Sequence, residues 1–144
     1  MVGLHNSYSP PAITGRPLGT PQSPYNLHAW ADWSTSHDSH YALLADNDNW
    51  ALISMYACNN APGPYPLWNE IFQITTSQGG TRLYRRIAHT RTQFASGCGT
   101  DDDYHSMPKA SISRDGRFTI WSARVNNGGT FRRDVYMAII PPAS

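Results

Sequence analysis

Hydrophobic and polar positions alternate most regularly towards the end of the chain. There, Asp115-Gly116 divides a short apolar segment from a longer run at 118–123. An Asp-Gly pair between such runs is a strong signal for a hairpin turn, because both residues tolerate positive φ. Within the run at 118–123 apolar and polar side chains alternate, which predicts a half-buried strand.

A third apolar run, at 135–140, follows a polar segment at 125–132 that we expect to be a loop. Val135, Met137 and Ile139 alternate with residues that are themselves mostly apolar, so we expect both faces of this last strand to be covered. The three runs together predict a meandering antiparallel sheet, the unit of a β-propeller blade. Loops displayed by such rigid sheets often carry binding residues, so the loop at 125–132 is one candidate surface.

A similar pattern occurs once earlier in the chain. Apolar runs at 51–56 and 69–74 have the same order and polarity as the two long strands predicted near the end, and a polar turn precedes the first of them. Self-similarity over a long period is typical of repeat architectures. The sequence therefore predicts two consecutive sheets of the same kind.

The sequence SISRDGRFTIWSARV, followed after a loop by RRDVYMAII, resembles the TolB-like β-propeller repeat. Arg114 stands where that repeat usually has Pro before Asp-Gly. The resemblance covers about two blades, residues 46–142, and implies an all-β fold of antiparallel β-meander blades. Because closed propellers have about 4–8 blades, the chain would be a partial propeller or one completed by self-association. The repeat is shared by proteins of unrelated activities, so it predicts no single function.

Two regions differ in composition. Residues 1–27 are rich in Pro, Gly and Ser, which disfavour central strands and helices, so we expect an extended arm or a long loop there. Such an arm could reach a neighbouring chain or serve as a linker. Residues 28–144 would form the propeller-like repeat domain.

Charge and hydropathy exclude several classes of protein. Eleven basic and ten acidic residues give a net charge of +1 with no basic stripe, so no nucleic-acid partner is expected. No apolar run approaches the roughly 18 residues that a membrane span requires. The phosphate-binding loop, the dinucleotide-binding glycine motif and the G-x-S-x-G nucleophile motif do not occur.

The two cysteines, Cys58 and Cys98, both fall in segments expected to be loops. A disulfide between them would close a loop of about 40 residues and add roughly 3–4 kcal/mol of stability. The alternative is two free thiols in separate loops. Because disulfides persist in oxidising compartments, a bridge would favour an extracellular or periplasmic location.

Aromatic residues are the first candidate ligand-binding group. Tyr65 and Trp68 lie in or beside a Pro-rich loop, where they could form a stacking platform for a sugar or a peptide. Trp30 and Trp33, in an alternating segment, are further candidates. The alternative for these side chains is to cover a sheet or its edge.

Histidines are the second candidate group, although their spacing matches no diagnostic metal motif. Oligogalacturonate lyases are propellers of the TolB-like repeat type, and they hold a divalent metal with histidines near the ring axis. That resemblance implies His28 and His105 as candidate metal ligands. The reaction would be a β-elimination, in which the metal polarises a uronate carboxylate.

These observations favour a non-enzymatic β-propeller-type binding or scaffold module that acts through self-assembly or protein contacts, with no catalytic residue. Its expected partners are further copies of the chain or the remainder of a larger propeller, with a glycan or a protein as ligand. The alternative is a carbohydrate-binding or metal-dependent uronate-lyase-like propeller fragment. No cofactor is expected apart from the divalent metal of that alternative.

Overall fold

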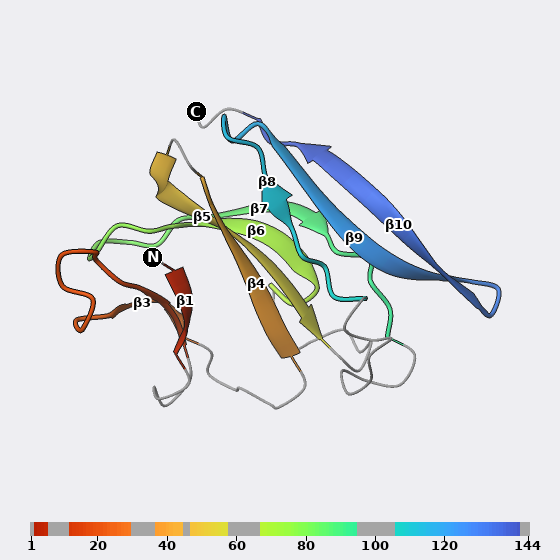
Figure 1. Ribbon diagram of the computed structural model, residues 1–144, viewed down its shortest axis with the longest axis horizontal. Helices are drawn as coiled ribbons and strands as arrows, with labels where there is room; N and C mark the ends of the chain where they lie inside the picture. Colours follow the sequence, from red (N-terminus) through yellow and green to blue (C-terminus); the bar gives the residue numbers. More distant parts are fainter. Residues whose placement is uncertain are drawn as a thin grey trace.

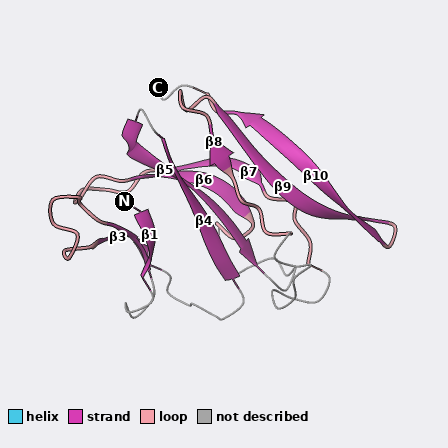
Figure 2. Cartoon of the chain, viewed as in Figure 1, coloured by secondary structure: helices cyan, strands magenta, loops and turns pink. Residues whose placement is uncertain are grey.

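The computed structural model describes residues 2–5, 12–29, 37–44, 47–57, 67–94 and 106–141 of the 144-residue chain. These residues form strands, turns and loops, with no helix among them (Figure 2). All the strand pairs are antiparallel, and they make three separate sheets. The all-β, meander-like architecture that the alternating pattern predicts is therefore confirmed for the described residues.

The three sheets follow one another along the chain (Figure 1). The N-terminal sheet has the order β1-β2-β3, with β1 at Val2–His5, β2 at Ala12–Gly15 and β3 at Tyr25–Ala29. The middle sheet has the order β4-β5-β6-β7, with strands at His37–Leu44, Asn47–Ala57, Glu70–Thr75 and Tyr84–His89. The C-terminal sheet has the order β10-β9-β8, with β8 at Ser111–Ile112, β9 at Phe118–Asn127 and β10 at Thr130–Ile139.

The middle sheet is covered on both faces. Successive side chains of a strand point to opposite faces, yet every residue from 51 to 56 on β5 and from 70 to 74 on β6 is buried. One face packs against the N-terminal sheet in a cluster of Ile13, Leu27, Ala51, Ile53, Met55, Leu67, Phe72 and Ile74. The other face packs against the C-terminal sheet in a cluster of Leu52, Ile71, Ala110, Trp121 and Ala123. The fold is therefore a stack of three sheets.

Hydrogen bonds between segments far apart in the sequence join the outer sheets to the middle sheet. The buried Ser54 hydroxyl on β5 accepts a bond of 3.2 Å from the backbone N–H of Ala110, just before β8. The Tyr25 hydroxyl on β3 donates a bond of 2.5 Å to the carbonyl of Thr76, just after β6. Each outer sheet is thus joined to the middle sheet by a polar contact as well as by apolar packing.

The N-terminal region, expected to be an extended arm or a long loop, contributes strands β2 and β3 among its described residues. Its described prolines, Pro17, Pro21 and Pro24, lie between β2 and β3, so neither strand loses a backbone donor to proline. Ile13 and Leu27 are buried in the core, which ties both strands to the middle sheet. Gly15 lies against Tyr25 so closely that an added Cβ would stand 2.4 Å from the ring.

The β8–β9 turn contains Asp115 and Gly116. Gly116 has a φ of 73°, and its N–H donates to the carbonyl of Ser113 at 2.9 Å. The Asp115 carboxylate accepts bonds from the Ser113 hydroxyl at 2.6 Å and from the N–H of Arg117 at 3.1 Å. These two bonds, the hydroxyl first, lower the pKa of Asp115 below its ordinary value.

The segment at 125–132, expected to be a loop, belongs instead to the β9–β10 hairpin. Gly128 and Gly129 have φ values of 61° and 90°, the conformation of a two-residue hairpin turn. The ladder therefore continues to the turn, where Thr130 pairs with Asn127. The expectation that both faces of the last strand are covered is wrong for the described residues, because Val135, Met137 and Ile139 are exposed.

We expect Leu52→Ala and Ile53→Ala each to lower the free energy of unfolding by about 2–5 kcal/mol. These neighbours point to opposite faces of β5, and both are fully buried. Urea denaturation measures the change, with Leu18→Ala as the matched control at an exposed site. If only one of the two core substitutions were destabilising, the middle sheet would have a solvated face and the three-layer order would be contradicted.

We expect Gly116→Val to lower the free energy of unfolding by about 1–2 kcal/mol, because a side chain is strained at positive φ. Gly19→Val is the matched control, since Gly19 lacks a positive φ and an added Cβ there meets nothing within 4 Å. Thermal unfolding of both variants makes the comparison. Equal stability of the Gly116 variant and the wild type would contradict this turn geometry.

Candidate functional site

Five exposed apolar side chains lie together on one face of the β9–β10 hairpin. They are Phe118, Ile120, Val135, Met137 and Ile139, and we call this set the apolar outer face. The ladder makes the set contiguous, because Phe118 pairs with Ile139 and Ile120 pairs with Met137. The three β10 members are 66–72% exposed.

The opposite face of the hairpin packs against the middle sheet, so the apolar outer face is the one that is left exposed. Trp121 on β9 stacks on Tyr136 of β10, with ring centroids 5.7 Å apart, and its indole N–H donates to the carbonyl of Thr90 at 3.1 Å. Thr119 is also buried on this face, and its hydroxyl donates to the carbonyl of Ser111. The five apolar side chains are therefore held on the solvent side.

β10 is also an edge strand within the part of the chain that the structure describes. It forms a ladder with β9 over residues 130–139, and no other described strand pairs with it (Figure 1). An edge strand presents backbone donors and acceptors to its surroundings, which makes it a template for association.

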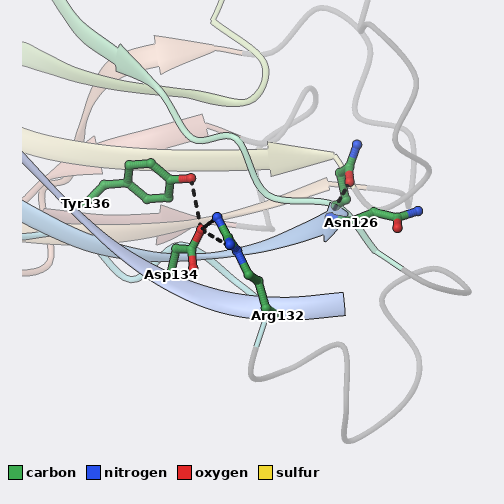
Figure 3. A network of polar contacts seen from close by, with 5 residues as sticks. Asn126, Arg132, Asp134 and Tyr136 are labelled. Carbon is green, nitrogen blue, oxygen red and sulfur yellow. Dashed lines mark hydrogen bonds and ion pairs between the residues drawn. The ribbon is translucent and has the colours of Figure 1, made fainter. Parts of the chain in front are cut away.

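A group of polar residues lies towards the Gly-Gly end of the same hairpin (Figure 3). The Asp134 carboxylate accepts bonds from Arg132, at 3.1 Å from Nε and 3.0 Å from Nη2, and lies 3.5 Å from the Tyr136 hydroxyl. The Asn126 side chain accepts a bond of 2.9 Å from the N–H of Gly129, which supports the turn.

A pocket of about 240 Å³ opens beside this group and is lined by Arg124, Phe131, Arg132 and Arg133. The guanidinium carbon of Arg124 lies 4.0 Å from the centroid of the Phe131 ring, so the two planar groups form a cation–π contact. The sequence pattern alone did not predict this pocket. Its signal was the Arg-Arg pair at 132–133 together with Arg124, which the hairpin register brings opposite Arg133.

Two of the candidate ligand-binding and metal-binding residues lie among the described residues. Trp68 is half-buried and packs against the core cluster that faces the N-terminal sheet, so it serves as packing. His28, on β3, shares a hydrogen bond of 2.6 Å between its Nδ1 and the Tyr84 hydroxyl on β7. The remaining candidates, Tyr65, Trp30, Trp33, His105, Cys58 and Cys98, lie outside the described residues.

The His28–Tyr84 contact links the N-terminal sheet to the middle sheet. The two rings meet edge to face, with centroids 5.5 Å apart. Burial lowers the pKa of His28 and raises that of Tyr84, because it disfavours the charged form of each. Among the described residues, no group of three or more His, Cys, Asp or Glu side chains is arranged to hold a metal ion.

Comparisons with known proteins find no match, so the interpretation of the candidate site rests on its geometry. No protein-family model matches the chain, and no curated protein or solved structure matches it either. The resemblance to the TolB-like repeat therefore rests on the sequence motif. Within the described ranges, no helix has the length and apolar character needed to cross a membrane.

We expect His28 to titrate below its ordinary pKa of 6.5 in NMR spectra of the folded protein. Below pH 6.5 the unfolded chain then binds a proton that the folded chain does not, so the contribution of His28 to stability is complete above that pH. It declines as the pH falls from 6.5 to the lower folded-state pKa.

His28→Asn should therefore lose less stability than the wild type on acidification through this window, as measured by urea denaturation. Tyr84→Phe removes the hydrogen bond but keeps the ring, so a depressed pKa in that variant would identify burial as the cause. A His28 pKa at or above 6.5 in the wild type would contradict the assignment.

Proposed function

We propose that this protein is a non-enzymatic assembly module, in which the apolar outer face packs against the same face of a second copy. The observation that carries the proposal is the contiguous exposure of five large apolar side chains on β9 and β10. Apolar patches of this kind on otherwise polar surfaces mark interaction sites more often than chance. Burial of such area is the dominant favourable term in most protein association.

The architecture of the chain supports sheet-on-sheet packing as the mode of association. Within one copy, each neighbouring pair of sheets already buries its facing side chains in this way. A partner sheet stacked on the apolar outer face would continue the same arrangement at the usual spacing of about 10 Å.

A second copy is favoured over an unrelated partner by the layout of the patch. The exposed apolar side chains lie at one end of the hairpin and the arginines, Arg124 and Arg133, at the other. A two-fold axis through the patch and perpendicular to the strands would set the patch of one copy on the same patch of the other, with the arginine ends at opposite ends of the interface. Isologous pairing thus covers the patch without opposing like charges.

The TolB-like resemblance supports the same class of function. Meander sheets stacked face to face are how propeller blades contact one another. We propose that the three sheets are blade-like units of an incomplete propeller. In a ring closed head to tail, the apolar outer face would meet the N-terminal sheet of another copy, whereas isologous pairing would join two C-terminal sheets.

We expect the wild type to form a stable dimer, and Val135→Lys combined with Met137→Lys to raise its dissociation constant by at least about a hundredfold. The monomer should remain as stable as before, because both side chains point into solvent. Light scattering during size-exclusion chromatography, over a range of protein concentrations, measures the change.

Leu18→Lys combined with Leu83→Lys is the matched control, since it adds the same charge at exposed leucines elsewhere. The control should stay dimeric. A wild type that is monomeric at every concentration, or equal dissociation of both double variants, would refute the proposal. A photoreactive residue at position 137 should cross-link to β9–β10 of the other copy, and cross-linking to β1–β3 would indicate a head-to-tail ring instead.

A further inference from the structure

We propose that the outer edge of β10 pairs with β10 of another copy, antiparallel and centred on Met137, so that face-packed dimers join into a closed tetramer. The edge pairing follows from the hydrogen-bond register of the hairpin, whereas the closed tetramer also rests on the proposed function. Among the strands that the structure describes, β10 pairs with β9 alone (Figure 1).

The hydrogen-bond register decides which backbone groups of β10 point away from β9. In an antiparallel ladder, opposed residues alternate between pairs that exchange hydrogen bonds and pairs that do not. The N–H of Ile140 donates to the carbonyl of Arg117 at 2.7 Å, so these two opposed residues are bonded. The next pair along the ladder is Ile139 with Phe118, and the Phe118 carbonyl accepts instead from Ser113, on the β8 side, at 2.9 Å. The backbone N–H and C=O of Ile139 therefore point outward from the hairpin.

The same alternation applies along the rest of β10. Since bonded and non-bonded pairs repeat every second residue, the backbone groups of Val135 and Met137 point outward like those of Ile139. The side chains of these three residues also belong to the apolar outer face. A strand added at this edge would thus bond to three successive outward residues and would widen the apolar outer face.

The apolar half of β10 lacks the features that usually protect an edge strand. Natural proteins blunt such edges with charged residues, proline or bulges. β7, at one edge of the middle sheet, has Arg85 and Arg86 and a register shift in its ladder with β6. β10 pairs with β9 without any shift over residues 130–139, and its segment 135–139 has no charged residue and no proline. This edge is therefore suited to pairing with another strand.

The sequence of β10 favours a second copy as that strand. With Met137 opposite its own equivalent, Val135 of each copy lies opposite Ile139 of the other, so all three outward residues fall in bonded pairs. The charged residues at 132–134 lie outside the paired segment in this register. The ladder then ends where Pro141, which has no N–H to donate, would have to pair. The apolar half of β10 is thus complementary to itself.

Edge pairing and face packing are geometrically compatible. The edge pairing has a two-fold axis perpendicular to the sheet, whereas the face packing has one that lies between the stacked sheets and runs perpendicular to the strands. When both axes pass at the level of Met137, they intersect at right angles and generate a closed tetramer with D2 symmetry. In this tetramer each of the two stacked sheets is built from the C-terminal sheets of two copies.

Hydrogen exchange measured by NMR tests the edge pairing. We expect the amides of Val135, Met137 and Ile139 to exchange at least about tenfold more slowly as the protein concentration rises. The amides of Tyr136 and Ala138 bond to β9, so they are the internal control and should be protected at every concentration. Fast exchange of the three outward amides at every concentration would overturn the edge pairing and leave the proposed function intact, because face packing covers the side chains and not the edge.

Met137→Pro and Met137→Ala are a matched pair of variants. Both shorten a side chain of the apolar outer face, but only proline removes an outward N–H, and it leaves the bonds to β9 in place. We expect the association of dimers into tetramers to be at least about tenfold weaker for Met137→Pro than for Met137→Ala, as measured by analytical ultracentrifugation. Circular dichroism and thermal unfolding verify that both variants are folded.

Equal association of the two Met137 variants would overturn the edge pairing. A wild type that forms dimers with protected outward amides, and no tetramer at any concentration, would support the edge pairing and refute the face packing of the proposed function.

Discussion

The burial of the middle sheet on both faces is the constraint on which the rest of this structure depends. β5 and β6 contribute apolar side chains to two separate clusters, one towards each neighbouring sheet. A sheet of this kind has no polar face to present to water, so the outer sheets are required for its stability. The positions of β1–β3 and of the β9–β10 hairpin follow from the need to cover these two faces.

Sequence reasoning predicted the strands more reliably than the layers. The Asp-Gly turn and the alternating run at 118–123 indicated β8 and β9, because local steric preferences and a period of two suffice to recognise a hairpin. Alternation shows which side chains share a face but not which face is covered. Thr119 is buried with Trp121, while Phe118 is exposed, and this assignment depends on the middle sheet. The strands at the N-terminus were not predicted, because the segment around them is rich in Pro, Gly and Ser, which disfavour strands.

The candidate site was accessible to sequence reasoning only in part. Val135, Met137 and Ile139 were recognisable as one face of a strand, but their exposure depends on the three-layer packing. The arginine pocket depends on the register between β9 and β10, and the two-residue Gly-Gly turn sets that register. A turn longer by one residue would place Arg124 opposite a different side chain. The hairpin therefore carries two distinct surfaces, one apolar and one cationic, both of which follow from its turn.

The order of the sheets along the chain has a consequence for synthesis on the ribosome. The N-terminal sheet emerges before the middle sheet and can cover the Ile53 face as soon as β5 and β6 pair. The Leu52 face must wait until β9 has emerged, because Trp121 and Ala123 provide its cover. During that interval the nascent chain presents an apolar β-surface, the kind of surface that invites aggregation and that chaperones shield. The rate at which the C-terminal third is translated therefore bears directly on the yield of folded protein.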